Sequence, residues 1–150
     1  NYLRENFPES ICVIQKEQLG TAHAVLAVQS FKNIIADNVL ILAGDMPLLT
    51  YETLREVIKF KQLQGLNGVV VSAFLDNPAG YGRLIKDEGG NIIQIVEESD
   101  ATENQKKIQY INSSIYCFDR DILFNFLKKQ RYILISFPNH FLNHPFSISF

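Results

Sequence analysis

Three short, largely apolar runs, separated by segments with helical spacing, restrict the fold of this sequence more than any other feature. The runs are Ile11–Gln15, Val39–Ala43 and Val69–Leu75. A continuous apolar run of this length is typical of a strand that is covered on both faces, as in a parallel sheet. The order strand, helix, strand, helix, strand predicts an α/β domain with a mostly parallel, doubly wound sheet.

The two segments between these runs carry signals of helix starts. Gly20 follows the first run, and apolar residues recur at helical spacing over Thr21–Phe31. Thr50 is a predicted N-cap, and Glu52 lies in the first turn, where the helix dipole favours a carboxylate. This second helix is expected to end near Leu63, with four apolar side chains on its inner side: Leu54, Val57, Ile58 and Leu63.

The pattern after Leu75 changes to that of a hairpin added to the sheet. Leu84–Lys86 and Ile92–Glu97 flank "DEGGN", in which two glycines can take the positive φ of a tight turn. A further strand is expected within Gln109–Phe118, and Asp119 is a candidate cap for a helix that reaches Lys129. Residues 1–129 are therefore assigned to one domain.

Residues 130–150 do not continue this pattern. They hold four phenylalanines and two prolines, and neither helical nor strand periodicity is sustained. We expect an apolar tail that is not native to the fold, as would follow a change of reading frame or a truncation. The alternative is an unusual apolar extension that packs on the sheet.

Composition and charge narrow the classes of function. The length of 150 residues fits a single domain, and the net charge of −2 offers no basic surface for nucleic acid or an anionic membrane. No apolar run is long enough to span a bilayer, and Asn1–Ser10 does not resemble a signal peptide. Cys12 and Cys117 form no ligand-like cluster. We expect a cytoplasmic protein with reduced thiols that binds neither nucleic acid nor membrane.

Asp45 is the first candidate functional residue, because it closely follows the apolar run Val39–Ala43. Ligands of open α/β sheets collect beyond the carboxyl ends of the strands. A carboxylate at that edge can hold Mg²⁺, which prefers oxygen ligands together with substrate phosphates. Gly44 would let a ligand approach the backbone closely. The alternative is a turn aspartate that bonds neighbouring backbone amides.

A second set of candidates precedes the first predicted helix. Gln15 and Gln18 carry amides with both donors and acceptors, which suit the edge of a pyrimidine. Gly20 leaves room for a flat ring against the main chain, and Thr21 can cap the helix and present its hydroxyl. An ordinary turn between a strand and a helix explains these residues about as well. His23 lies inside the helix, where a structural role is more frequent.

The loop Asn77–Ile85 is a third candidate. Its glycines, Gly80 and Gly82, would let the backbone approach a sugar or a phosphate. Arg83 could pair with an acid or with a phosphate. The alternative is an ordinary loop between strands.

Two polar positions beside strands complete the candidates. Glu97 ends an apolar strand, and it or a neighbouring acid, Glu98 or Asp100, could accept hydrogen bonds from sugar hydroxyls. Asn112 lies at the start of a strand, where its amide could bond a sugar hydroxyl or only a turn.

Five segments together resemble the uridylyltransferase domain of bacterial N-acetylglucosamine-1-phosphate uridyltransferases. They are "QKEQLGTAHAV", "AGDMPLL", "NPAGYGRLI", "IVEESDAT" and "IQYINSSIY", in the order of the family and close to its spacing. The resemblance runs from Asn1 to about Lys129. It implies a Rossmann-like nucleotidyltransferase domain, with a mostly parallel mixed sheet and a β-hairpin insertion.

The resemblance also implies roles for individual residues. Gln15 and the Gly20-Thr21 pair match positions that recognise uracil, and Asp45 matches the aspartate that binds Mg²⁺. Three further residues match positions that hold the N-acetylglucosamine and ribose portions of the product: Gly82, Glu97 and Asn112. No catalytic side chain is implied, because attack on the α-phosphorus of UTP needs mainly positioning and charge stabilisation.

The implied reaction converts UTP and N-acetylglucosamine 1-phosphate to UDP-N-acetylglucosamine and pyrophosphate, for peptidoglycan and lipopolysaccharide precursors. Bifunctional members of the family continue into an acetyltransferase domain, and intact members oligomerise through a domain that these residues do not include. Two alternatives stay open. One is a pyrophosphorylase for a different nucleotide sugar, and the other is a nucleotide-sugar-binding remnant without chemistry.

The sequence departs from the pattern of the family in several places. It contains no glycine-rich phosphate loop with an arginine and a lysine, and no match to a later asparagine that completes the metal site. Ala43 replaces a tyrosine, and Asn112-Ser113-Ser114 replaces "NTG". We therefore expect a fragment without the first strand and the phosphate loop. Its activity alone should be low, because losing one charge-stabilising group costs about 10²–10³ in rate.

Overall fold

The structure is a computed structural model, which describes residues 2–90 and 92–129. The predicted tail, residues 130–150, lies outside the described residues. The chain divides into two compact units, residues 1–35 and residues 36–150.

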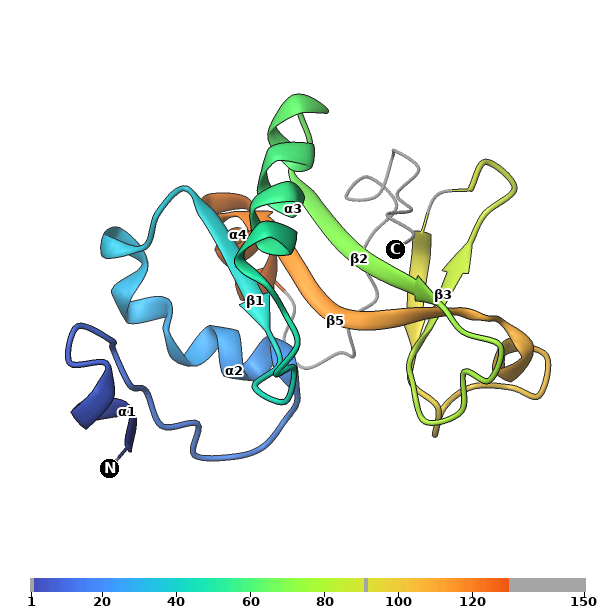
Figure 1. The fold of residues 1–150 in the computed structure, drawn as a ribbon, viewed down its shortest axis with the longest axis horizontal. Helices are drawn as coiled ribbons and strands as arrows, with labels where there is room; N and C mark the ends of the chain where they lie inside the picture. The colour runs from blue at the N-terminus through green and yellow to red at the C-terminus, as the bar shows by residue number, and fades with distance from the viewer. Residues whose placement is uncertain (1, 91, 130–150) are drawn as a thin grey trace. The chain divides into compact units, whose positions relative to one another are not determined.

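The first unit consists of short helices joined by extended coil. Its helices are α1 (Tyr2–Asn6), α2 (Thr21–Ala27) and the 3-10 helix η1 (Gln29–Ile34), drawn in blue in Figure 1. The predicted helix Thr21–Phe31 is confirmed at its start. The α-helical part ends at Ala27, and a tighter 3-10 turn continues to Ile34.

The expectation of a buried strand at Ile11–Gln15 is wrong. These residues form no strand, and the side chains of Ile11 and Ile14 are 51% and 84% exposed. A strand is stable only when its backbone N–H and C=O groups pair with a neighbour. Within residues 2–90 and 92–129, no strand pairs with this run. Apolar character alone does not supply the partner that a strand needs.

The second unit is a five-stranded sheet with a helix on each face. Its strands are β1 (Asn38–Leu42), β2 (Gly68–Phe74), β3 (Arg83–Lys86), β4 (Ile92–Val96) and β5 (Tyr110–Asp119). Its helices are α3 (Tyr51–Leu63), α4 (Arg120–Lys129) and the short 3-10 helix η2 (Gln105–Lys107). In Figure 1, α3 lies in front of the strands and α4 behind them, so the predicted α/β architecture is confirmed.

β5 is the central strand of the sheet. One of its edges pairs with β2. The other edge pairs with β3, where Arg83 faces Ile111, and further along with β1, where Leu42 faces Ile115. Because β1 and β2 both run antiparallel to β5, they point in the same direction on either side of it.

The prediction of mostly parallel pairing is wrong. Every strand pair in the described part of the chain is antiparallel. The α3 crossover does keep β1 and β2 parallel in direction, as the local pattern predicts. β5 is inserted between them from much later in the chain, and no local signal predicts that insertion. β1 is half-buried rather than covered on both faces. It is an edge strand, with β5 as its one partner among the described strands.

The hairpin and the last two elements agree with the sequence analysis. β3 and β4 pair antiparallel, and Gly90 in the connecting turn has a φ of 82°. The predicted strand within Gln109–Phe118 is β5, and a helix follows it to Lys129.

The core of the second unit lies between α3 and the sheet. Val57 of α3 is completely buried and packs in one apolar cluster with alternate residues of β2 and β5. These residues are Val69, Val71, Ile115 and Cys117. Because side chains alternate along a strand, Val70, Tyr116 and Phe118 point to the opposite face, where α4 packs.

Helix α3 begins as predicted but buries a different residue near its end. The Thr50 hydroxyl accepts a hydrogen bond from the Thr53 N–H at 3.2 Å, so the predicted N-cap is confirmed. Leu63, expected on the inner side, is 73% exposed. The inner stripe that contains Leu54 and Val57 continues at Lys61, which is 3% exposed.

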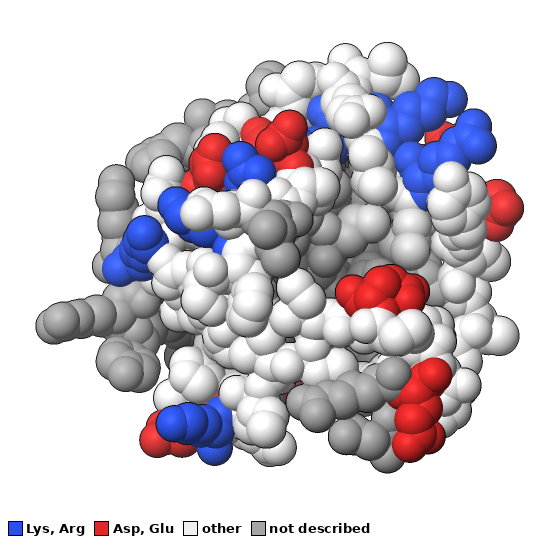
Figure 2. Space-filling view, turned by 90° about the vertical axis from the view of Figure 1, so that its left-hand side faces the viewer, with Lys and Arg blue, Asp and Glu red and all other residues white. Residues whose placement is uncertain are grey.

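No helix among the described residues is long and apolar enough to cross a membrane. On the face drawn in Figure 2, basic and acidic side chains occur in small groups separated by uncharged surface.

Candidate functional site

The predicted site residues fall into two sets, one in each unit. Gln15, Gly20 and Thr21 belong to the first unit. The remaining four belong to the second unit: Asp45, Gly82, Glu97 and Asn112.

In the first unit, Gln15 is held against the start of α2. Its Nε2 donates to the Gly20 carbonyl at 3.3 Å and lies 2.9 Å from Nδ1 of His23. With Nε2 as the donor, Nδ1 of His23 is the acceptor, and the imidazole proton is on its Nε2. The structure therefore brings Gln15 and Gly20 together as predicted. It also gives His23 the structural role that its position in the helix favours.

The backbone at Gly20 explains why a glycine is needed there. Gly20 is the N-cap of α2 and has a φ of 89°, a conformation that costs other residues strain. A Cβ on Gly20 would meet nothing within 4 Å, so the space beside its backbone is open. Thr21 is exposed, and no side-chain hydrogen bond caps α2, so the predicted capping role of Thr21 is wrong.

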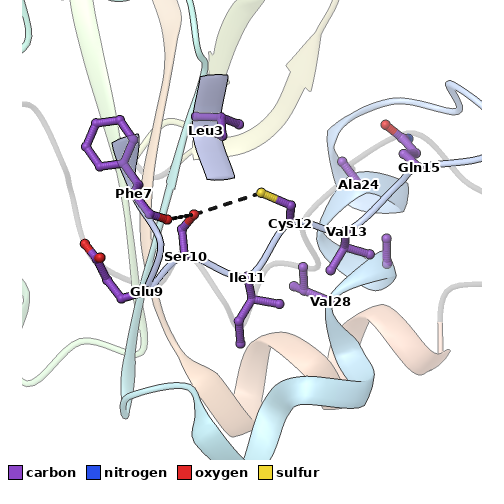
Figure 3. A pocket seen from close by; sticks show the side chains of 11 residues that line it. Leu3, Phe7, Glu9, Ser10, Ile11, Cys12, Val13, Gln15, Ala24 and Val28 are labelled. Atoms are coloured by element: carbon purple, nitrogen blue, oxygen red, sulfur yellow. Dashed lines mark hydrogen bonds between the residues drawn. The ribbon is translucent and has the colours of Figure 1, made fainter. Parts of the chain in front are cut away.

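A separate hollow of about 540 Å³ lies in the first unit (Figure 3). Its lining is largely apolar, with Gln15 as the one predicted site residue in it. Gly20 and Thr21 are not part of the lining, so this hollow does not bring the predicted uracil residues together.

In the second unit, Asp45 is exposed in the turn that follows β1. Its carboxylate makes no hydrogen bond or ion pair with any described residue, so the backbone-bonding turn aspartate is not observed. The described residues contain no group of three or more His, Cys, Asp or Glu arranged to hold a metal ion. A single free carboxylate fits Mg²⁺ binding of the kind completed by waters and substrate phosphates.

Gly82, Glu97 and Asn112 converge where β3, β4 and β5 meet. The Asn112 N–H donates to the Gly82 carbonyl at 2.8 Å. A Cβ on Gly82 would lie 3.2 to 3.4 Å from the Glu97 carboxylate, which is tighter than an ordinary contact. The missing side chain therefore lets this carboxylate lie against the backbone. The three residues predicted to hold the N-acetylglucosamine and ribose portions of the product are neighbours in the structure.

These residues lie at a gap along one edge of β5. On that edge, β3 pairs with β5 at Ile111, and β1 pairs with β5 from Ile115 onward. Residues 112–114 lie between these two pairings and are not part of either strand ladder. β1 ends opposite Ile115, and the antiparallel register directs the chain that leaves it toward this gap. Asp45 lies on that departing segment, three residues after the end of β1.

Sequence analysis missed Tyr116, which contacts this group directly. Asn112 Nδ2 donates to the Tyr116 hydroxyl at 2.6 Å, and Asn112 Oδ1 accepts from the Ser114 N–H at 3.2 Å. Burial raises the pKa of Tyr116, and the nearby charge of Glu97 adds to the rise. Hydrogen bonding from Asn112 and Ser114 acts in the opposite direction. Two serines interrupting a strand pattern indicate an irregular backbone, but no sequence signal identifies the Asn112–Tyr116 bond.

The irregular backbone is a bulge in β5. Tyr116 faces Val70 and Asn112 faces Ser72, so β5 has two extra residues over this stretch. Ser114 has a φ of 60° and is the one non-glycine residue at positive φ in the described chain. Glycine has no steric penalty in that region, which explains physically why the matching family pattern has glycine there.

The buried side chain of Arg83 is fully engaged in contacts within the fold. It is 1% exposed, and its guanidinium donates to the Lys106 carbonyl at 3.1 and 3.3 Å and also to the Tyr81 carbonyl. Its Nη2 forms an ion pair with Glu98 Oε2 at 2.7 Å. The prediction that Arg83 could pair with an acid is therefore confirmed, and the acid is Glu98. The same ion pair engages Glu98, which favours Glu97 as the carboxylate for a sugar.

Comparisons of the sequence with known proteins identify its family and its relatives. The sequence model of the nucleotidyl transferase family matches residues 3–133. The bifunctional protein GlmU of Caldanaerobacter subterraneus is 46% identical over 105 residues, which are 70% of this chain and 23% of the relative. That of Pelotomaculum thermopropionicum is 47% identical over 118 residues, 79% of this chain and 26% of the relative. The chain thus spans about a quarter of the length of the curated relatives it matches.

Proposed function

The chain belongs to the nucleotidyl transferase family, and we propose that it binds UDP-N-acetylglucosamine as part of a uridylyltransferase. The proposed enzyme converts UTP and N-acetylglucosamine 1-phosphate to UDP-N-acetylglucosamine and pyrophosphate. Residues 1–129 would form the nucleotidyltransferase part, with residues 130–150 as an appended apolar tail. Similarity to relatives named bifunctional protein GlmU supports the choice of uridine and N-acetylglucosamine.

The convergence of Gly82, Glu97 and Asn112 carries the proposal. An exposed carboxylate accepts hydrogen bonds from hydroxyls, and an amide both donates and accepts. The Gly82 backbone lets that carboxylate lie close to β5, because a Cβ on residue 82 would crowd the carboxylate. Together they present the mixture of donors and acceptors that a sugar with several hydroxyls requires.

Gln15, Gly20 and Thr21 have the chemistry that contacts to a uracil base require. The open space beside the Gly20 backbone suits a flat ring, and the exposed Thr21 hydroxyl is available at the start of α2. Hydrogen bonds to Gly20 and His23 fix the amide nitrogen of Gln15. The amide oxygen therefore has a defined direction, in which it could accept from the N–H of a uracil ring.

Asp45 would hold Mg²⁺ through its free carboxylate. The ion, when bound, would neutralise negative charge that two polyanionic substrates bring together. The chain's own contribution is to orient the sugar phosphate and the nucleotide for in-line attack. The 150 residues contain no glycine-rich loop with arginine and lysine, so as an isolated polypeptide they should bind product better than they catalyse turnover.

Isothermal titration of the chain with UDP-N-acetylglucosamine tests the proposal. We expect saturable binding, weakened roughly tenfold or more in Glu97→Gln because a charged hydrogen-bond acceptor is lost. Glu88→Gln is the matched control, since Glu88 is an exposed carboxylate on the β3–β4 turn. Absence of binding by the unchanged chain, or equal effects of the two substitutions, would contradict the proposal.

Further titrations separate the alternatives. Tighter binding of another nucleotide sugar would favour a pyrophosphorylase of different specificity. Binding of UDP-N-acetylglucosamine without pyrophosphate release from UTP and N-acetylglucosamine 1-phosphate would favour a binding remnant.

A further inference from the structure

The amide of Asn112 has a fixed orientation inside the fold. Asn112 is 7% exposed, its Nδ2 donates to the Tyr116 hydroxyl, and its Oδ1 accepts from the Ser114 N–H. A rotation of the amide by 180° would place an N–H against the Ser114 N–H and an oxygen at the Tyr116 hydroxyl. The Ser114 N–H can only donate, so it defines which end of the amide is the acceptor, and the Tyr116 hydroxyl accepts from the other end.

These two bonds use half of the hydrogen-bonding capacity of the Asn112 amide. A primary amide has two N–H donors and two acceptor lone pairs, so Asn112 retains one of each. A single sugar hydroxyl can accept from the first and donate to the second. The usefulness of Asn112 for binding a sugar thus depends on its amide keeping one orientation.

We propose that Tyr116 is a positioning residue that holds the Asn112 amide in the orientation required to bind the sugar of a nucleotide sugar. This inference rests on the proposed function, and it adds a residue that does not itself touch the ligand. Tyr116 acts through its hydroxyl oxygen, which is the acceptor for the Asn112 amide.

The Tyr116 ring is itself fixed by burial and packing, so its hydroxyl can hold the Asn112 side chain in place. It is 4% exposed, and its ring stacks on that of Phe118, with centroids 6.2 Å apart and planes inclined by 15°. The ring packing remains when tyrosine is replaced by phenylalanine, and the acceptor for the Asn112 amide is lost. Tyr116→Phe therefore separates the positioning bond from the packing of the core.

The test compares two ligands with two variants of the full 150-residue chain. Titration calorimetry would measure dissociation constants for UDP-N-acetylglucosamine and for UDP. In Tyr116→Phe we expect UDP-N-acetylglucosamine binding to weaken roughly three- to tenfold, with UDP binding unchanged. Tyr110→Phe is the control, because Tyr110 is on the same strand but its ring contacts Phe74 and Lys86. It should leave both constants unchanged.

If the role of Tyr116 were purely structural, Tyr116→Phe would weaken the binding of both ligands together. That result would overturn the inference. Unchanged binding of UDP-N-acetylglucosamine by Tyr116→Phe would overturn it as well, while leaving the proposed function intact. If the unchanged chain does not bind UDP-N-acetylglucosamine, the proposed function fails, and this inference fails with it.

A measurement without ligand checks the bond itself. In NMR spectra of the unchanged chain, the Asn112 side-chain amide should give two distinct proton signals that exchange slowly with solvent, and Tyr116→Phe should speed that exchange. Rapid exchange in the unchanged chain would contradict the fixed amide and overturn the inference.

Discussion

Replacing Lys61 tests how the second unit is held together, because its ammonium group is buried where three elements meet. Lys61 Nζ donates to Asn38 Oδ1 at 3.0 Å and forms an ion pair with Asp119. These contacts join α3 to the start of β1 and the end of β5. Breaking these contacts should destabilise the end of the sheet where β5 finishes, away from the candidate sugar site.

The magnitude follows from burial and from exposure of the partner. Lys61→Ala removes three buried methylene groups, about 2 kcal/mol of burial free energy, and a hydrogen bond of about 1 kcal/mol. The Asp119 side chain is 38% exposed, so water can replace the lost cation and the ion pair adds little. We expect about 3 kcal/mol of destabilisation for Lys61→Ala, and about 1 kcal/mol for Lys61→Met, which retains the apolar stem.

Urea unfolding followed by circular dichroism would measure both variants. Lys59→Ala is the control, because Lys59 is exposed on the same helix and its replacement should change stability by less than about 0.5 kcal/mol. A Lys61→Ala variant as stable as this control would refute the argument from burial. Equal losses in Lys61→Ala and Lys61→Met would show that the apolar stem contributes nothing.

Three further predictions follow from particular residues. Ser114 has a φ of 60°, so Ser114→Gly should be more stable than Ser114→Ala by about 1 kcal/mol in urea, and the reverse order would contradict this source of strain. Cys12 is exposed, whereas Cys117 is buried and burial raises its pKa. One thiol should therefore react rapidly with a disulfide reagent and the second only on unfolding, and two equal rates would contradict the burial of Cys117. Burial raises the pKa of Tyr116 above its usual 10.0, so its neutral form is favoured by folding. Its contribution to stability is complete below pH 10 and is lost as the pH rises through the folded-state pKa, so Tyr116→Phe should lose less stability in alkaline urea titrations. Identical alkaline slopes would contradict this.

Elements with their own local signals could be predicted from the sequence. Thr50 carries its capping signal in its hydroxyl, and α3 begins after it. The glycines of "DEGGN" permit a tight turn, and the β3–β4 hairpin forms around it. In each case the information is contained within a few neighbouring residues, so the pattern is sufficient.

Features that depend on distant residues could not be predicted in this way. Ile11–Gln15 has the apolar character of a strand but no strand partner among the described residues. Lys61 is charged, and its burial depends on Asp119, 58 residues later. The insertion of β5 between β1 and β2 likewise depends on pairing over long separations.

The candidate sugar site shows both situations. Gly82, Glu97 and Asn112 were identified from a resemblance of motifs, and the structure brings them together. Tyr116 was missed because its contact with Asn112 needs the bulge at residues 113–115, which no periodic pattern describes.

We propose that the backbone of Gly82, the carboxylate of Glu97 and the amide of Asn112 form a binding site for the sugar of UDP-N-acetylglucosamine. The most direct test is a titration of the isotopically labelled chain with this ligand, followed by NMR of the backbone amides. We expect saturable shifts at these three residues that UDP alone does not reproduce, with Lys59 on the exposed side of α3 unaffected. Shifts confined to other residues, or the same shifts with UDP alone, would contradict it.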